Sequence, residues 1–192
     1  MNRAKFVLML VSAAIQFALP MSHQALAQSL APGDPSTIGK TFLTSENGRR
    51  VQISDFRGKV VFITFWGNWC PPCIDEMNSV RDLQAALKDR RDAVAFVFIS
   101  ARTQAFPDDI DWLKRHGIAG EAYQWEPRFP EQRYAFFGAL PDQPAFSVPT
   151  TYVLDRNGGV VETATAPVDW QARLHTFLNL LSDRPAEPLY LY

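Results

Sequence analysis

A nearly uninterrupted apolar run at residues 60–66, VVFITFW, restricts this chain to a small set of folds. Its β-branched and aromatic residues are typical of a central strand that is buried on both faces of a sheet. Apolar residues then recur at helical spacing from Met77 to Leu87, and a second apolar run follows at residues 94–99. A strand, a helix and a strand within about 40 residues predict a βαβ unit, so we expect an α/β protein.

Two hairpins are predicted around this unit. Asn47-Gly48 and Asn157-Gly158 both tolerate the positive φ that a tight hairpin turn needs, and a short candidate strand lies on either side of each. The paired segments are residues 41–45 with 50–54, and residues 150–154 with 160–165.

Two further helices are predicted from their amphipathic patterns, at residues 108–116 and 170–181. Asp108 or Asp109 is expected near the start of the first, and Gly117 just past its end. Residues 120–148 are rich in aromatic residues and proline but show little regular period, so we predict no element there.

The N-terminus has the features of a secretory signal peptide: basic residues, an uncharged apolar run at residues 6–19, and Ala25-Leu26-Ala27 as a cleavage site. An apolar run of about 14 residues is short of the roughly 20 needed to cross a bilayer. The 19 basic and 20 acidic residues form no basic block of the kind that binds nucleic acid. We therefore expect a signal peptide at 1–27, a lead-in at 28–39, one domain at 40–182 and a C-terminal tail at 183–192.

The chain has two cysteines, in the sequence Cys70-Pro71-Pro72-Cys73 between the first strand and its helix. With Cys70 as the N-cap, the two prolines occupy the first helical positions, where a missing N–H costs little. Pro72 has no N–H to donate, so the Cys73 N–H is left to face the Cys70 sulfur. The helix dipole stabilises a thiolate there, which should lower the pKa of Cys70 below about 8.5 and make Cys70 the nucleophile. Cys73, being more covered, is expected to resolve the mixed disulfide.

Other interpretations of the pair are weaker. A structural disulfide over so short a loop contributes roughly 2 kcal/mol, against about 4.7 kcal/mol for a loop of 100 residues. A structural zinc site needs four ligands, and the mature chain offers only His116 and His175 besides the cysteines. A non-enzymatic copper-binding or chaperone module is open, because thiolates suit Cu(I), but no methionine cluster supports it. A strand–CxxC–helix arrangement within βαβ favours redox chemistry instead.

Several motifs together resemble the exported thioredoxin-like proteins of the TlpA/ResA/CcmG (DsbE) type. These motifs are the segments at residues 58–66, 69–73, 76–77, 148–151 and 154–158. The resemblance implies a thioredoxin-like fold, with a central mixed sheet flanked by helices, an N-terminal β-hairpin extension and a central insert. It also implies a periplasmic thiol:disulfide oxidoreductase that needs no cofactor or metal and reduces exported proteins, apocytochrome c among them. A disulfide-donating oxidase would use the same residues in the opposite direction.

The same resemblance assigns roles to further residues. Pro149 matches the family's cis-proline, which presents the Val148 backbone to an extended substrate beside the Cys70–Cys73 disulfide. Glu76 matches a glutamate that tunes the thiol pKa values and relays protons, although a solvated carboxylate in the first turn would also explain it. Trp69 is expected in the apolar platform around Cys70. The expected partners are exported protein thiols and disulfides, with a membrane thiol reductase as electron donor, and the protein is expected to be a monomer.

Overall fold

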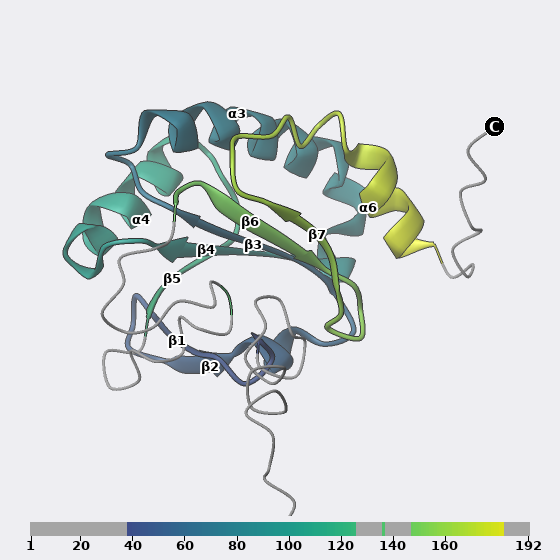
Figure 1. Ribbon diagram of the computed structural model, residues 1–192, viewed down its shortest axis with the longest axis horizontal. Coiled ribbons are helices and arrows are strands. Elements are labelled where there is room, and N and C mark those ends of the chain that lie inside the picture. The colour runs from purple at the N-terminus through teal and green to yellow at the C-terminus, as the bar shows by residue number, and fades with distance from the viewer. Residues whose placement is uncertain (1–37, 126–135, 137–146, 183–192) are drawn as a thin grey trace, which may run out of the picture.

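The computed structural model describes residues 38–125, 136 and 147–182. Its centre is a sheet of seven strands in the order β2-β1-β5-β4-β3-β6-β7 (Figure 1). The strands are β1 (Phe42–Ser45), β2 (Arg50–Gln52), β3 (Val60–Trp66), β4 (Val94–Ser100), β5 (Glu121–Trp125), β6 (Thr150–Leu154) and β7 (Val160–Ala164). The α-helices are α3 (Pro71–Ala86), α4 (Phe106–Arg115) and α6 (Leu174–Leu181), and the 3₁₀ turns are η1 (Ile53–Phe56), η2 (Lys88–Ala93) and η3 (Thr103–Ala105). The predicted signal peptide and the C-terminal tail lie outside the described residues.

The central strand β3 pairs in parallel with β4, from Val60 opposite Val94 to Trp66 opposite Ser100. On its other side β3 pairs antiparallel with β6. All seven residues of β3 are buried, as its unbroken apolar sequence predicts for a strand covered on both faces. The prediction of a mixed sheet built on a βαβ unit is therefore confirmed.

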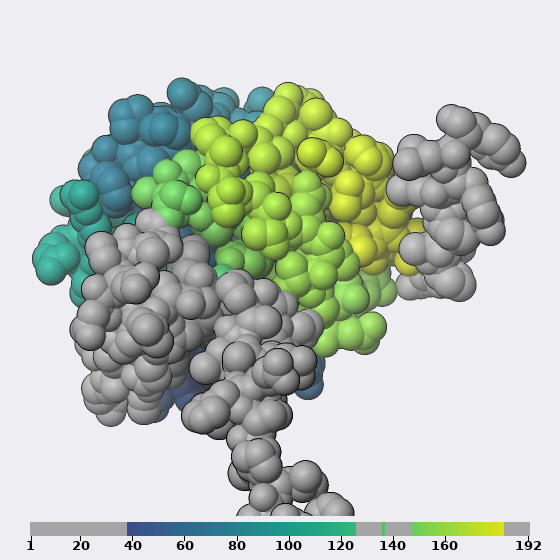
Figure 2. All heavy atoms as spheres, viewed as in Figure 1, coloured from purple at the N-terminus to yellow at the C-terminus, as the bar shows by residue number. Residues whose placement is uncertain are grey.

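Different elements pack on the two faces of the sheet. Helices α3, α4 and α6 contribute to one apolar cluster, in which Phe62, Met77 and Phe177 are fully buried. In the space-filling view the yellow-green surface of the segment that follows β7 borders the blue surface of α3 (Figure 2). The opposite face packs against the β1–β2 hairpin, η1 and the buried Phe136.

Both predicted hairpins are present. β1 pairs antiparallel with β2, and β6 with β7. Gly48 and Gly158 have φ values of 77° and 87° in the two turns, a backbone conformation that most side chains disfavour.

One strand and two helix boundaries differ from the prediction. Strand β5 was not predicted, because its five residues, EAYQW, form a strand by pairing with β4 and β1 rather than by a strong local pattern. Helix α4 begins at Phe106 rather than near Asp108, since Pro107 suits the first turn of a helix. Helix α6 begins at Leu174 rather than Trp170, after a turn in which the Arg173 N–H bonds to the Trp170 carbonyl.

Candidate active site

The cysteine pair lies at the start of α3, shortly after the end of β3. Cys70 is the N-cap of α3, Pro71 and Pro72 occupy its first positions, and the Cys73 N–H points at Cys70 Sγ from 3.3 Å. This is the arrangement that the two prolines predict. A disulfide joins Cys70 to Cys73, whose Cα atoms are 5.3 Å apart, and Cys70 is 5% exposed while Cys73 is fully buried. Of the two sulfurs, that of Cys70 is the one that a partner can reach.

The loop before β6 lies against the pair. The Val148–Pro149 peptide bond is cis, as the resemblance implies. The carbonyl oxygen of Val148 lies 3.7 Å from Cys70 Sγ, while Pro149 itself is buried. The Val148 backbone therefore runs directly beside Cys70 Sγ, where an extended peptide could pair with it.

Glu76 is buried under the loop of residues 165–173, which connects β7 to α6. Its side chain is 2% exposed, and its Oε1 atom accepts a hydrogen bond from the Trp170 indole N–H. Thr151 Oγ1 lies 3.4 Å from Glu76 Oε1 and 2.9 Å from Thr64 Oγ1, so its hydroxyl links the two side chains. The alternative explanation of Glu76 as a solvated carboxylate is wrong, because a loop about 90 residues away in the sequence closes over this turn of α3.

Burial raises the pKa of Glu76 to about 7, since a carboxylate loses its hydration there. The hydrogen bonds from Trp170 and Thr151 act in the opposite direction. The Val168 N–H also lowers the pKa, but Oε2 is buried and has no partner with full hydrogen-bond geometry. Glu76 can therefore change its protonation near neutral pH. It follows Cys73 by three positions in α3, a spacing that places two side chains on one face of a helix.

A second buried carboxylate, Asp109 of α4, holds the loop before Cys70. Its Oδ1 accepts the Asn68 N–H at 2.7 Å, and its Oδ2 is hydrogen-bonded to the Ser100 hydroxyl. Burial raises the pKa of Asp109, and these two hydrogen bonds oppose the effect. Nothing in the sequence near Asp109 suggested this role, since an acid in the first turn of a helix is common on electrostatic grounds alone.

Trp69, directly before Cys70, is 37% exposed, and the Arg102 guanidinium carbon lies 3.6 Å from the centroid of its ring. Trp66, in contrast, is buried in the core. Arg102 was not predicted to lie at this site, because it follows β4 and approaches Trp69 only through the parallel pairing of β3 with β4.

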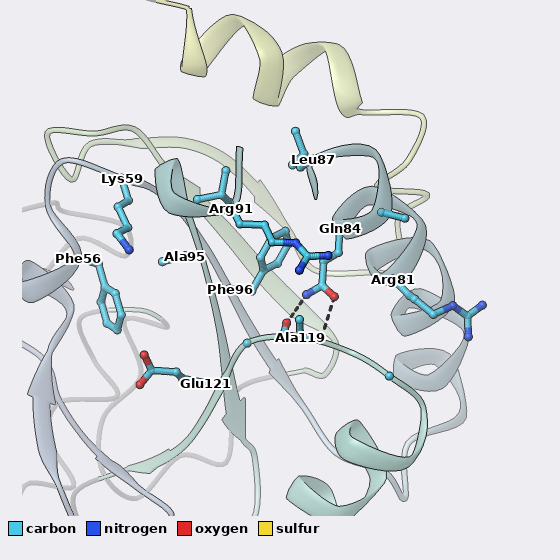
Figure 3. A pocket seen from close by; sticks show the side chains of 14 residues that line it. Phe56, Lys59, Arg81, Gln84, Leu87, Arg91, Ala95, Phe96, Ala119 and Glu121 are labelled. Carbon is cyan, nitrogen blue, oxygen red and sulfur yellow. Dashed lines mark hydrogen bonds between the residues drawn. The ribbon is translucent and has the colours of Figure 1, made fainter. Parts of the chain in front are cut away.

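One cavity lies away from the cysteines, at the end of the sheet where β3 and β4 begin (Figure 3). It measures about 380 Å³ and has an apolar floor that includes Phe96. Gln84 exchanges two hydrogen bonds with the Ala119 backbone, and Glu121 binds Arg49 at 2.8 Å, so both are already paired. The described residues that line this cavity include no buried polar side chain that would select a ligand.

The described residues contain no group of three or more His, Cys, Asp or Glu side chains placed to hold a metal ion. In the same parts of the chain, none of the helices has both the length and the hydrophobicity to span a bilayer.

Comparison with known proteins agrees with this geometry. The Redoxin family model matches residues 28–181. ResA, a thiol-disulfide oxidoreductase of Bacillus cereus, is 25% identical over 170 residues, which cover 84% of this chain and 87% of ResA. ResA of Bacillus subtilis is 24% identical over 181 residues, with 94% and 92% covered.

Among solved structures, a Chlorobium tepidum protein described as the thiol:disulfide interchange protein DsbE superposes with a TM-score of 0.55 and 25% identity, over 75% of this chain and 97% of its own. A secreted thiol-disulfide isomerase of Corynebacterium glutamicum gives a TM-score of 0.62 at 24% identity, over 75% of this chain and 84% of its own, and supports the fold. The expected thioredoxin-like fold is confirmed, and the chain belongs to the Redoxin family as a thiol-disulfide oxidoreductase of the TlpA/ResA/CcmG type.

Proposed function

We propose that this protein works in the periplasm and reduces disulfides of exported proteins, apocytochrome c among them, through the Cys70–Cys73 pair. The observation that carries the proposal is the position of Cys70, at a helix N-terminus and 3.7 Å from the Val148 carbonyl oxygen. The helix N-terminus stabilises a Cys70 thiolate, and the Val148 backbone can hold an extended partner segment against it. Trp69 and Pro149 complete the proposed substrate-binding surface.

The reaction takes place in two exchanges. The Cys70 thiolate attacks one sulfur of the partner disulfide, forms a mixed disulfide, and releases the other partner sulfur as a thiolate that takes up a proton. Cys73 then loses its proton, and its thiolate attacks Cys70 Sγ. The partner leaves with both sulfurs reduced, two electrons have passed to it, and the Cys70–Cys73 disulfide remains. A membrane thiol reductase is the proposed source of the next two electrons.

Glu76 is the proposed acceptor of the Cys73 proton. A general base works best when its pKa lies near the working pH, and burial raises the pKa of Glu76 to about 7. Replacing Glu76 with Gln should remove a step near pH 7 from the pH dependence of the second exchange. Asp75→Asn, which removes an exposed carboxylate from the adjacent position, is the matched control. An unchanged profile in the Glu76→Gln protein would take Glu76 out of the mechanism.

The whole scheme is tested by trapping partners in the cell with Cys73→Ala. This variant should accumulate mixed disulfides through Cys70, because the resolving thiol is missing, whereas Cys70→Ala should accumulate none. No covalent partner, together with a Cys70 thiol that does not react with iodoacetamide, would contradict the scheme.

The direction of transfer is tested by the reduction potential of the pair. A value near the roughly −270 mV of thioredoxin supports a reductant, and a value near the roughly −120 mV of DsbA would instead make the protein a disulfide donor. Tight Cu(I) binding without turnover of insulin disulfides would favour the copper-binding module.

A further inference from the structure

A charged platform stands beside the reactive sulfur. Trp69 is one of three large hydrophobic side chains that are markedly exposed in the described parts of the chain, and it directly precedes Cys70. Arg102 stacks on its ring at 3.6 Å. We use the name Trp69–Arg102 platform for these two side chains. Because Trp69 is the neighbour of Cys70 in the chain, we expect a partner segment that reaches Cys70 to pass close to the platform.

Neighbouring residues hold the Trp69–Arg102 platform in a fixed position. Trp69 packs so closely on Gly67 that a Cβ at this position would lie 2.3 Å from the indole Nε1. Asp109 binds the Asn68 N–H on one side and the Ser100 hydroxyl on the other, and Ser100 Oγ lies 2.9 Å from the Arg102 carbonyl oxygen. The two loops that carry the platform are thus fixed to one buried carboxylate. Such a preorganised site loses little conformational entropy when a partner binds.

The charge of Arg102 is available to a partner. No described acid forms an ion pair with it, and the carboxylate of Asp109 is occupied by Asn68 and Ser100. A guanidinium that stacks by its face keeps its N–H edges free, and these edges match the two oxygens of a carboxylate.

We propose that the Trp69–Arg102 platform selects partner segments that carry an acidic side chain next to the reacting cysteine. The proposal rests on the proposed reductase function and adds the class of partner to it. The aromatic ring supplies contact area to any segment, while Arg102 supplies the preference between charges.

The test measures how fast the reduced protein reacts with two disulfide peptides. The peptides are identical except that Asp or Lys flanks the reacting cysteine on both sides, and the products are quenched with acid and counted by mass spectrometry. An exposed ion pair contributes about 0.2–1 kcal/mol, so each charge should change the rate by up to about fivefold in favour of the Asp peptide. Raising the salt concentration from 0.15 to about 0.5 M should shrink the preference, since it screens exposed charges.

Variants of Arg102 identify the source of the preference. Arg102→Gln should abolish it, Arg102→Glu should reverse it, and Arg102→Lys should keep most of it. Arg91→Glu, at the far end of the sheet, makes the same change in net charge and should leave the preference intact. Hydroxyethyl disulfide, which is uncharged, reports any general change in Cys70 reactivity and serves to normalise each rate.

The possible results separate two failures. If the wild-type protein reduces neither peptide, the proposed function is wrong. If it reduces both at equal rates, or if Arg102→Gln keeps the preference, the function stands and the selection of acidic partners is wrong.

Discussion

Two buried carboxylates support the cysteine pair, and they are held in different ways. Both oxygens of Asp109 have a partner, namely the Asn68 N–H and the Ser100 hydroxyl. Glu76 accepts hydrogen bonds at Oε1 from Trp170 and Thr151. Among the described residues, none makes a hydrogen bond of full geometry with its Oε2. Burial raises the pKa of both groups. A carboxylate that is hydrogen-bonded at both oxygens fixes a loop, whereas one that is bonded mainly at a single oxygen can hold a proton on the other.

The largest change in unfolding free energy is expected from substitutions of Trp170, which donates a hydrogen bond to Glu76. Trp170→Ala removes a fully buried ring and should cost about 3–5 kcal/mol of unfolding free energy. Trp170→Phe keeps most of the apolar contact but loses the N–H to Glu76, which should cost about 1–3 kcal/mol when Glu76 is ionised. Urea unfolding of the disulfide form at pH 8 and pH 5 measures both, and the cost of Trp170→Phe should be smaller at pH 5.

Trp125→Phe is the matched control for Trp170, because no described residue forms a hydrogen bond with the buried indole Nε1 of Trp125. The loss of unfolding free energy in Trp125→Phe should not depend on pH. If both Trp→Phe variants lose the same unfolding free energy at pH 5 and at pH 8, the Trp170–Glu76 hydrogen bond does not contribute to stability.

The next effect is the pH dependence of stability. The pKa of Glu76 is about 7 in the folded protein and 4.5 as the ordinary value, so the unfolded chain releases this proton first as the pH rises. The folded state should therefore lose stability between about pH 4.5 and 7, by about 3 kcal/mol at about 1.4 kcal/mol per pKa unit. Unfolding of the disulfide form across this range should show the slope, and Glu76→Gln should remove most of it. A slope that survives in Glu76→Gln but vanishes in Asp75→Asn would contradict the assignment.

A smaller effect is expected at Asp109. Asp109→Ala leaves the Asn68 N–H without its acceptor and should cost about 1–3 kcal/mol in unfolding free energy. It should also reduce the preference for acidic peptides, because the loops that carry Trp69 and Arg102 lose their common anchor. Asp109→Asn keeps an acceptor oxygen and should preserve more of both. If the preference is unaffected in Asp109→Ala, Asp109 does not position the platform.

The smallest effect should come from the threonines. Thr151→Val removes a hydroxyl from Glu76, should cost about 0.5–1.5 kcal/mol, and should raise the pKa of Glu76 further. Thr64→Val leaves the Thr151 hydroxyl free to serve Glu76 alone and should not raise that pKa. The carboxyl carbon chemical shift of Glu76, followed by NMR across the titration, distinguishes the two variants. Identical titrations would show that Thr151 does not influence Glu76.

Local signals made the start of α3 predictable. Cys70 as N-cap and a Cys73 N–H that faces the Cys70 sulfur follow from two prolines in adjacent positions, and these features depend on only four residues. The hairpins were predictable for the same reason, since an Asn-Gly turn determines its own backbone conformation.

The features that escaped prediction depend on contacts between distant segments. Glu76 is buried because residues 165–173 cover it, and no sequence pattern near Glu76 indicates this burial. Arg102 reaches Trp69 because β3 and β4 are parallel and in register, with Trp66 opposite Ser100, so the loops that follow them leave the sheet side by side. Strand β5 forms by adding its backbone to two existing edges. In each case the information lies in the pairing of two segments, which composition and periodicity do not contain.

The loop over Glu76 is also fastened to α3 through the hydroxyl group of Ser79. Ser79 Oγ lies 3.0 Å from the Val168 carbonyl oxygen and accepts the Trp170 N–H at 3.1 Å. Water must displace this loop to reach the carboxylate, so the Trp170 amide becomes a built-in reporter of that event. Its hydrogen–deuterium exchange rate counts how often the proton held by Glu76 comes into contact with solvent.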